Sequence, residues 1–316
     1  MNILFDNVDW NSTAGPHWFG RKLADYLRNT GHQINPDPSV CQVQLSIVMA
    51  SQKHEGLPLI QRLDGIYYDT TKNYKDLNYP ISATYDIADG VVFQSGWSKK
   101  LVESIFGPAD NCTIIHNGAD IETIRSTDPA TGLEAFDKVW SCASSWFYED
   151  GTPRNIKRLD ENIRYFQEHA GEKDILCVAG HPGNTENPDP MKIVFLGELD
   201  IPSLYSLYRA SDYFIHLGRF DNCPNVVVDA RAAGCHIICS SLGGTIEVAG
   251  KDATVIEEDE WDFVPFEANL KTVLDFTRKK VNPYDKNISM EFVADKYLGY
   301  FEEIHNGTSR RKNQIL

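Results

Sequence analysis

The sequence lacks the features that define several large classes of protein. It has no run of ~18 apolar residues that could cross a bilayer. Its first ten residues, MNILFDNVDW, lack the basic region of a secretory signal. No glycine-rich GxGxxG follows the first predicted strand, which argues against a nicotinamide dehydrogenase. We therefore expect a cytoplasmic protein without a transmembrane segment.

Paired cysteines and positive charge are also scarce. The seven cysteines form no CxxC pair, which argues against a zinc site and against a disulfide framework. The net charge of -15 opposes binding to nucleic acid, because phosphate backbones require clustered Lys and Arg. It also disfavours firm adhesion to an anionic membrane, although peripheral membrane contact stays open. The expected partners are small molecules.

The organisation of the chain indicates an α/β protein. Its 316 residues suffice for two domains of about 100–200 residues each. Short apolar runs alternate with helical patterns throughout, which predicts mainly parallel sheets covered on both faces by helices. A polar stretch between Ile121 and Lys138 predicts a boundary between a first domain (residues 1–127) and a second domain (residues 128–287). Two amphipathic helices are predicted for the tail, at residues 264–280 and 288–304.

The most informative segment is residues 221–244, DNCPNVVVDARAAGCHIICSSLGG. Pro224 fits the first position of a helix that Gly234 ends. Asn225 and Asp229 are four residues apart and share one helix face. A helix N-terminus is a favourable place for a phosphate. The N–H groups predicted to point out of this one are those of Asn225, Val226 and Val227.

These residues resemble the retaining GT-B glycosyltransferases of the large family, glycosyl transferases group 1, that includes sucrose and trehalose-phosphate synthases. In that family, two glutamates separated by seven residues hold the donor sugar and the ribose. An Ala-rich helix and a Gly-Gly pair follow them. Asp221 and Asp229 stand at the two glutamate positions, and each carboxylate is one methylene shorter. The resemblance extends over nearly the whole chain.

The resemblance also implies a set of donor-binding residues. Arg154, Lys157 and Arg158 replace the family's usual basic residues after the first strand of the second domain. Lys157 is the first candidate and Arg158 the second for stabilising the leaving diphosphate, whose negative charge grows as the bond breaks. A solvated basic helix start is the alternative reading. Backbone contacts with the donor are implied at Gly15 for the phosphates, and at Gly197 and Leu199 for the base.

The predicted acceptor side lies in the first domain, which is short for this family. Asp64 is a catalytic candidate that could align the acceptor hydroxyl. An ordinary Asp-Gly turn explains Asp64 and Gly65 equally well. Arg62 and His17 are the other acceptor-side candidates.

The resemblance implies a GT-B fold with two facing Rossmann-like domains and a cleft between them. It leaves room for the last segment, residues 288–316, to return to the first domain. The implied reaction moves a hexosyl group from a nucleoside diphosphate sugar to an acceptor hydroxyl with retention, without a metal or another cofactor. A catalytically silent sugar-nucleotide-binding or scaffold protein remains an alternative, as does a sugar-nucleotide hydrolase or epimerase. Neither the donor base nor the acceptor follows from the sequence.

Overall fold

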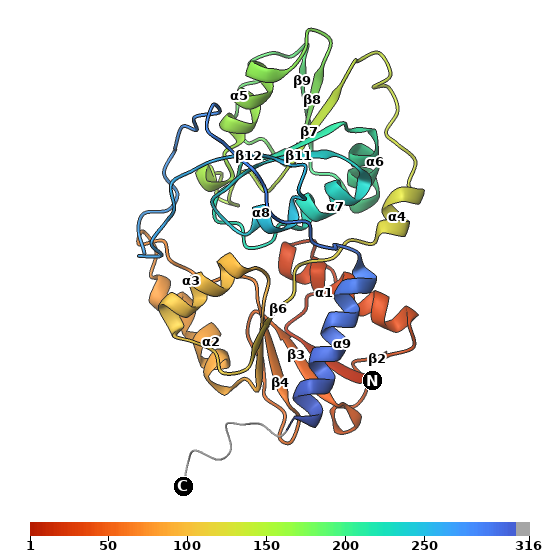
Figure 1. Cartoon of the computed structure of the whole chain (residues 1–316), viewed down its shortest axis with the longest axis vertical. Coiled ribbons are helices and arrows are strands. Elements are labelled where there is room, and N and C mark those ends of the chain that lie inside the picture. Colours follow the sequence, from red (N-terminus) through yellow and green to blue (C-terminus); the bar gives the residue numbers. More distant parts are fainter. Residues whose placement is uncertain (308–316) are drawn as a thin grey trace. The chain divides into compact units, whose positions relative to one another are not determined.

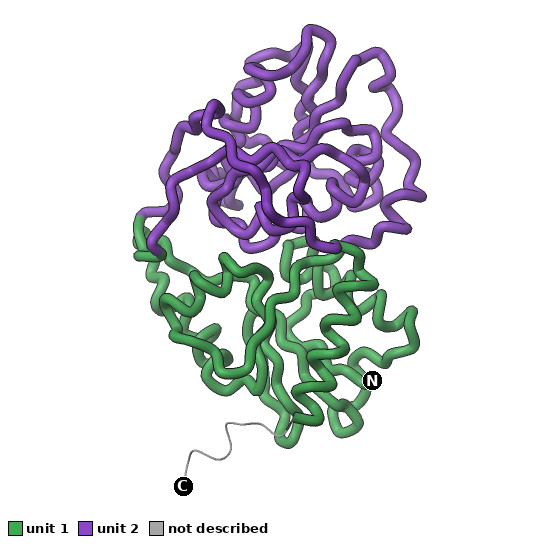
Figure 2. The backbone as a smooth tube through the Cα atoms, viewed as in Figure 1, with its two compact units in different colours: residues 1–118, 263–266, 288–316 green, residues 119–262, 267–287 purple. Residues whose placement is uncertain are grey.

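The computed structural model describes residues 1–307, which form two compact units (Figure 2). Within the described residues, unit 1 contains residues 1–118, 263–266 and 288–307, and unit 2 contains residues 119–262 and 267–287. The chain first passes from one unit to the other at Gly118, ahead of the predicted boundary at residue 127. The earlier change follows from helix α4 (Ile121–Ser126), which packs against helices of unit 2.

Unit 1 is built on a six-stranded parallel sheet with the order β2-β1-β3-β4-β5-β6 (Figure 1). The chain runs outward from β1 to β2 and then to β3 on the other side, so the direction of winding reverses beside β1. In such sheets, ligands bind outside the carboxyl ends of the strands at this reversal. The strands are β1 (Asn2–Asp6), β2 (Gln33–Ile34), β3 (Val43–Ile47), β4 (Leu59–Leu63), β5 (Gly90–Phe93) and β6 (Cys112–Ile114).

Two helices far apart in the sequence share the core of unit 1. The buried stripe of α1 follows helical spacing at Phe19, Leu23 and Leu27. Helix α9 lies beside α1 (Figure 1). Its Tyr297 and Phe301 join the same cluster, and the ring centroids of Phe19 and Tyr297 lie 5.8 Å apart. The helices of this unit are α1 (Gly15–Asn29), the short η1 (Pro38–Val40), α2 (Tyr74–Ile87), α3 (Gly96–Phe106) and α9 (Met290–Asn306).

Unit 2 has a seven-stranded sheet with the order β13-β12-β11-β10-β7-β8-β9. Counted from β7, its six parallel strands run 3-2-1-4-5-6, the order of a dinucleotide-binding Rossmann sheet. The winding reverses between β7 and β10, which marks the expected ligand position. The strands are β7 (Val139–Ala143), β8 (Ile175–Ala179), β9 (Ile193–Gly197), β10 (Tyr213–His216), β11 (His236–Ser240), β12 (Thr254–Ile256) and the antiparallel β13 (Lys279–Lys280).

The helices of unit 2 cover its sheet and close a core of its own. Trp140, Phe166 and Ile215 are buried in one hydrophobic cluster that draws on β7, α5 and β10. Helix α5 is strongly amphipathic, with one buried apolar face, as its apolar spacing predicts. The remaining helices are η2 (Asn155–Lys157), α5 (Leu159–His169), α6 (Ile201–Ala210), α7 (Asn225–Ala233) and α8 (Thr245–Val248).

The helix predicted at residues 264–280 is wrong. This stretch is irregular except for the two residues of β13. Arginine side chains take carbonyl groups that a helix would have used: Arg219 donates to those of Ala268 and Leu270, at 2.7 and 3.0 Å, and Arg164 to that of Leu274, at 2.6 Å. Tertiary hydrogen bonds therefore override the local amphipathic pattern. Within residues 1–307, no helix is long and apolar enough to span a membrane.

Candidate functional site

A polar cluster of unit 2 is centred on Asp221, beside the reversal of the sheet between β7 and β10. Lys157, at the end of η2, donates to Oδ1 of Asp221. Nε2 of His216, the last residue of β10, lies 2.7 Å from Oδ2. The side chains of Lys157 and Asp221 are 15% and 19% exposed, whereas that of His216 is 4% exposed. The carboxylate is thus engaged at both oxygens but still borders solvent.

The Gly243-Gly244 pair shapes the backbone around this carboxylate. The Gly244 N–H donates to the carbonyl of Asp221 at 2.7 Å, and the Phe220 N–H donates to that of Leu242 at 2.8 Å. Gly243 has a φ of 140°, and a Cβ there would lie 2.9 Å from the Asp221 carbonyl oxygen. Only glycine fits this approach. The sequence segment that begins at Asp221 and ends at Gly244 therefore folds back on itself.

The pKa of Asp221 lies below its ordinary value. Burial alone would raise the pKa, but the Lys157 ammonium and the hydrogen bond with His216 outweigh it. Asp221 is therefore a carboxylate at neutral pH. A fixed negative charge beside a lysine can hold that lysine in place and orient it.

Helix α7 begins one residue later than predicted, because Pro224 is its N-cap and Asn225 its first residue. No side chain caps this N-terminus, and Gly234 ends the helix in the left-handed conformation, as predicted. The N–H of Val227 donates to the Pro224 carbonyl at 3.2 Å. The amide of Val227, one of the three predicted to face a phosphate, is therefore used within the turn.

Asp229 lies deeper than Asp221. It is 3% exposed, and its charge contributes, after burial, to raising the pKa values of Tyr205 and Tyr208 on α6. The carboxylate therefore lies close to α6 at the buried side of α7. Its predicted contact with ribose stays a prediction.

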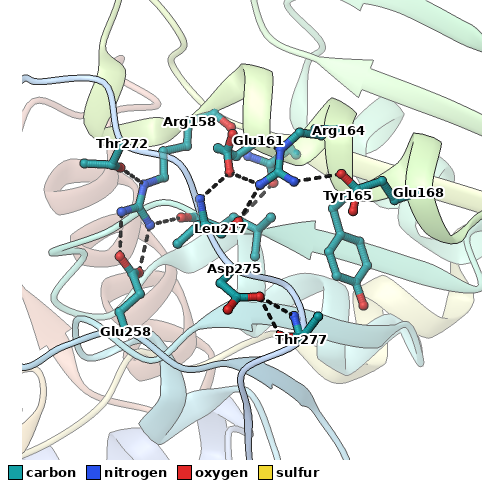
Figure 3. A network of polar contacts seen from close by, with 12 residues as sticks. Arg158, Glu161, Arg164, Tyr165, Glu168, Leu217, Glu258, Thr272, Asp275 and Thr277 are labelled. Carbon is teal, nitrogen blue, oxygen red and sulfur yellow. Dashed lines mark hydrogen bonds and ion pairs between the residues drawn. The ribbon is translucent and has the colours of Figure 1, made fainter.

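Arg158 has a different place from the one its sequence position suggests. It is 3% exposed, and its guanidinium makes two bonds to the Glu258 carboxylate, at 2.8 and 2.6 Å. It also donates to the carbonyl of Leu217 at 3.1 Å and to Thr272 Oγ1 at 2.9 Å (Figure 3). Its backbone is left-handed, with φ 56° and ψ 51°. This conformation turns the Arg158 side chain into the unit, so its geometry argues against a direct contact with a diphosphate.

Arg154 precedes Lys157 in the same turn. Its guanidinium lies over the ring of Tyr148, with its central carbon 5.0 Å from the ring centroid. The carbonyl of Arg154 accepts the N–H of Lys157 at 2.7 Å, so one tight turn carries both cations.

The residues predicted to meet the base lie at the end of β9. The carbonyl of Gly197 accepts the N–H of Gly180 at 2.7 Å, which joins the loops after β8 and β9. Gly197 has a φ of 69°. Leu199 is half-buried in the connection to α6.

Unit 1 brings Arg62 and Asp64 together at the end of β4. Arg62 is fully buried and donates to both Asp64 and Asn117, the latter at 2.5 Å. Its guanidinium also lies over the Phe19 ring, 3.9 Å from the centroid. Arg62 is therefore inaccessible to an acceptor, contrary to its predicted place on the acceptor side. The side chain of Asp64 is 12% exposed and also accepts from Gln94.

The other predicted residues of unit 1 lie at the start of α1, on the loop that follows β1. Gly15 is the first residue of α1 and is exposed. His17 Nδ1 accepts the N–H of Asp9 at 3.2 Å. Gly15 therefore lies where the loop after β1 meets α1, and the bond of His17 closes that loop. The contact of Gly15 with the donor phosphates stays a prediction.

Three residues of the cluster and its support escaped the sequence analysis, namely His216, Asn162 and Glu258. His216 carried a usable signal, because a polar residue ends an otherwise apolar strand, DYFIHLG, at the reversal of the sheet. Glu258 and Asn162 carried none, because their partners are distant in sequence.

The two Rossmann-like units define the class of fold. The structure matches that of sucrose-phosphate synthase from Thermosynechococcus elongatus with a TM-score of 0.65 at 12% identity, covering 98% of this chain and 100% of that one. It matches Anabaena HepE in complex with UDP and glucose with a TM-score of 0.63 at 13% identity, covering 96% and 100%. A glycosyltransferase from Rickettsia africae gives a TM-score of 0.61 at 13% identity, covering 97% and 99%. The chain has the GT-B fold.

A sequence match narrows this class for part of the chain. Residues 150–266 match the family model described as "Glycosyl transferases group 1". The matched segment contains Lys157, His216 and Asp221. An uncharacterized glycosyltransferase of Methanocaldococcus jannaschii is 25% identical over 207 residues, or 60% of this chain and 51% of that protein. The chain therefore spans about half the length of the curated relative that it matches.

Proposed function

We propose that this chain is a glycosyltransferase that moves a hexosyl group from a nucleoside diphosphate sugar to a hydroxyl of an acceptor. One observation carries the proposal. The segment that matches group 1 glycosyl transferases contains a lysine, a carboxylate and a histidine in contact, and they lie where the unit 2 sheet reverses its winding. This is the position at which doubly wound sheets bind nucleotides.

Unit 2 offers positive potential for a diphosphate from two sources. The N-terminus of α7 has no side-chain cap, and a helix N-terminus favours an anion. Lys157 and Arg154 share one turn and add two cations. In the proposed reaction the Lys157 ammonium stabilises the leaving diphosphate while Asp221 holds the lysine in place.

The proposed stereochemical course is retention, without a protein nucleophile. The departing phosphate oxygen accepts the proton of the acceptor hydroxyl on the face that the leaving group vacates, so one proton moves as one glycosidic bond breaks and another forms. Asp64, held by Arg62 and Gln94, is the proposed hydrogen-bond partner of the acceptor hydroxyl. We propose that cationic side chains and helix amides replace a divalent metal ion in this role.

The proposal is tested first by binding. Thermal unfolding is recorded with UDP, GDP, ADP and their sugars, because a ligand at ~100 times its Kd stabilises the native state by about 2.7 kcal/mol. One base is expected to raise the Tm above the other two. Failure of all nucleotides to change the Tm would contradict the donor assignment.

Turnover and stereochemistry form the second test. The stabilising sugar nucleotide is incubated with a panel of hydroxyl acceptors in excess EDTA, and the anomeric configuration of the product is read by NMR. Transfer with retention in EDTA is the expected result. Transfer with inversion would overturn the proposed course, and loss of transfer that Mg²⁺ restores would overturn the metal-independent reaction.

A catalytically silent sugar-nucleotide-binding protein is the second candidate. Two observations favour it: both oxygens of Asp221 are already engaged, and Asp229 is buried. Binding without transfer, hydrolysis or epimerisation would support this candidate, provided that Asp221→Glu together with Asp229→Glu also fails to turn over. A cytoplasmic location stays part of the proposal.

A further inference from the structure

Lys157 and His216, which contact Asp221, are each followed in the chain by a residue that buried polar side chains bind. These residues are Arg158 after Lys157 and Leu217 after His216. The bonds are made by Arg158, Asn162 and Glu258, here called the Arg158 clamp. Both Arg158 and Asn162 are buried, at 3% and 0% exposure.

Both backbone polar groups of Leu217 are hydrogen-bonded to side chains of the clamp. Its N–H donates to Oδ1 of Asn162 at 3.2 Å, and its carbonyl accepts from Nη1 of Arg158 at 3.1 Å. The side-chain nitrogen Nδ2 of Asn162 donates to the carbonyl of Arg158 at 2.6 Å and to that of Lys157 at 3.3 Å. The Asn162 side chain thus binds the backbone beside both Lys157 and His216, and the Arg158 side chain adds a second bond beside His216.

Glu258 fastens the clamp to the rest of the sheet. Its carboxylate binds the Arg158 guanidinium at two points and also accepts from Ser240, the last residue of β11. Its N–H donates to Oγ of Ser241 at 2.9 Å. Figure 3 shows the Arg158 guanidinium between the Glu258 carboxylate and Leu217. Together with the bonds of Ser240 and Asn162, these contacts join the carboxyl ends of β10, β11 and β12 to the turn that carries Lys157.

The buried Arg158–Glu258 ion pair is not explained by stability alone. A buried ion pair costs desolvation energy, and well-packed apolar residues often stabilise as well or better. A planar guanidinium, however, fixes two carboxylate oxygens and a carbonyl in a set direction. Reacting groups need such precision, because a misplacement of ~1 Å can cost about 100-fold in rate.

We propose that Arg158, Asn162 and Glu258 are positioning residues, which set the point at which Lys157 and His216 meet Asp221. The effect on turnover rests on the proposed glycosyltransferase function, whereas the effect on the geometry of His216 does not.

Arg158→Lys tests the clamp, since lysine keeps the charge but loses the planar fork. With the sugar nucleotide found in the binding screen, kcat is expected to fall by about tenfold or more while KM stays nearly unchanged. Arg164→Lys is the matched control. Arg164 lies on α5, the helix that begins directly after Arg158, and binds Glu161 and Glu168 at 2.6 and 2.7 Å (Figure 3). Its loss should lower stability without lowering kcat.

A second measurement needs no turnover. The side-chain nitrogens of His216, assigned with His216→Gln, are followed by ¹⁵N NMR. The hydrogen bond to Asp221 gives Nε2 a distinct shift and a slowly exchanging proton. Arg158→Lys is expected to change both, and Arg164→Lys to change neither. Should Arg158→Lys fold poorly, Glu258→Gln makes the same prediction with the arginine kept.

The outcomes separate this inference from the proposed function. A changed His216 signal in a chain that transfers no sugar would support the clamp and refute the enzyme. A His216 signal and a kcat in Arg158→Lys and Glu258→Gln that match Arg164→Lys would overturn the clamp, whatever reaction the wild type performs.

Discussion

At the scale of single residues, Asp221 holds together a lysine that reaches solvent and a histidine that does not. Its shorter side chain, compared with a glutamate, keeps the carboxylate close to the end of β10, where His216 lies. Lys157 is then the cation left facing outward. The proposed reaction therefore assigns charge stabilisation to Lys157 and orientation to Asp221.

Lys157→Ala should therefore lower turnover more than donor affinity. We expect kcat to fall by about 100- to 1000-fold, the range for removing one group that stabilises a developing anion. Donor affinity should fall less, because the α7 N-terminus and Arg154 remain. Steady-state kinetics measures both. Lys271→Ala is the control, since Lys271 pairs with Asp160 on the surface of the same unit. An unchanged kcat in Lys157→Ala would contradict the assignment.

The depressed pKa of Asp221 predicts a pH-dependent contribution to folding. A carboxylate with a lower pKa in the folded state stabilises the fold above its unfolded pKa, about 3.9. The contribution disappears as the pH falls toward the folded pKa. Asp221→Asn should thus lower the free energy of unfolding at pH 7, and its difference from the wild type should shrink below about pH 4. Urea denaturation at several pH values measures this difference. A difference that is constant with pH would show that Asp221 is not held as a carboxylate.

At the scale of elements, the turn at Gly243-Gly244 sets the position of Asp221. An alanine at Gly243 would place its Cβ against the Asp221 carbonyl and force a φ that L residues rarely adopt. We expect a loss of roughly 1–3 kcal/mol in stability, with weaker nucleotide binding. The opposite sign is expected for Gly299→Ala in α9, where a Cβ meets nothing and alanine favours the helix by about 1 kcal/mol. Equal effects of the two substitutions would refute the argument.

How much of each element follows from the sequence depends on where its hydrogen bonds go. Helix α7 could be predicted to within one residue, because Pro224 and Gly234 are local signals of its two ends. The apolar periodicity at residues 264–280 predicts a helix that does not form. Carbonyl groups of this stretch accept instead from Arg219 and Arg164, which lie elsewhere in the sequence. The sequence could not separate Arg158 from Lys157 for a related reason. Adjacent basic residues look alike in sequence, and only the left-handed backbone at Arg158 separates its side chain from that of Lys157.

At the scale of the whole chain, the alternation of strands and helices was enough to predict parallel sheets with helices on both faces. The strand order was not predictable, since parallel neighbours are joined through helices and the same alternation is compatible with several orders. Yet the order of unit 2 is what places Lys157, on the β7 side of the reversal, close to Asp221 on the β10 side. The site residues could thus be named from motifs, but their contacts required the topology.

Each unit also has its own hydrophobic core. A substitution in one core is therefore expected to lower the stability of that unit. Tyr297 of α9 is fully buried in unit 1 against Phe19. Tyr297→Ala should cost about 3–5 kcal/mol, as large truncations in cores do. Phe292→Ala on the same helix should change stability by less than about 0.5 kcal/mol, because Phe292 is 41% exposed. Calorimetry with and without the stabilising nucleotide measures both effects.

In this experiment, added nucleotide is expected to raise the unfolding temperature of unit 2 and so to identify its transition. Since the Lys157–Asp221–His216 cluster draws all its described contacts from unit 2, the transition that responds to nucleotide should keep its response in Tyr297→Ala. The transition that does not respond should move to lower temperature. Loss of the nucleotide response in Tyr297→Ala but not in Phe292→Ala would show that the donor site needs an intact unit 1 core, and the donor would then have to be assigned to both units.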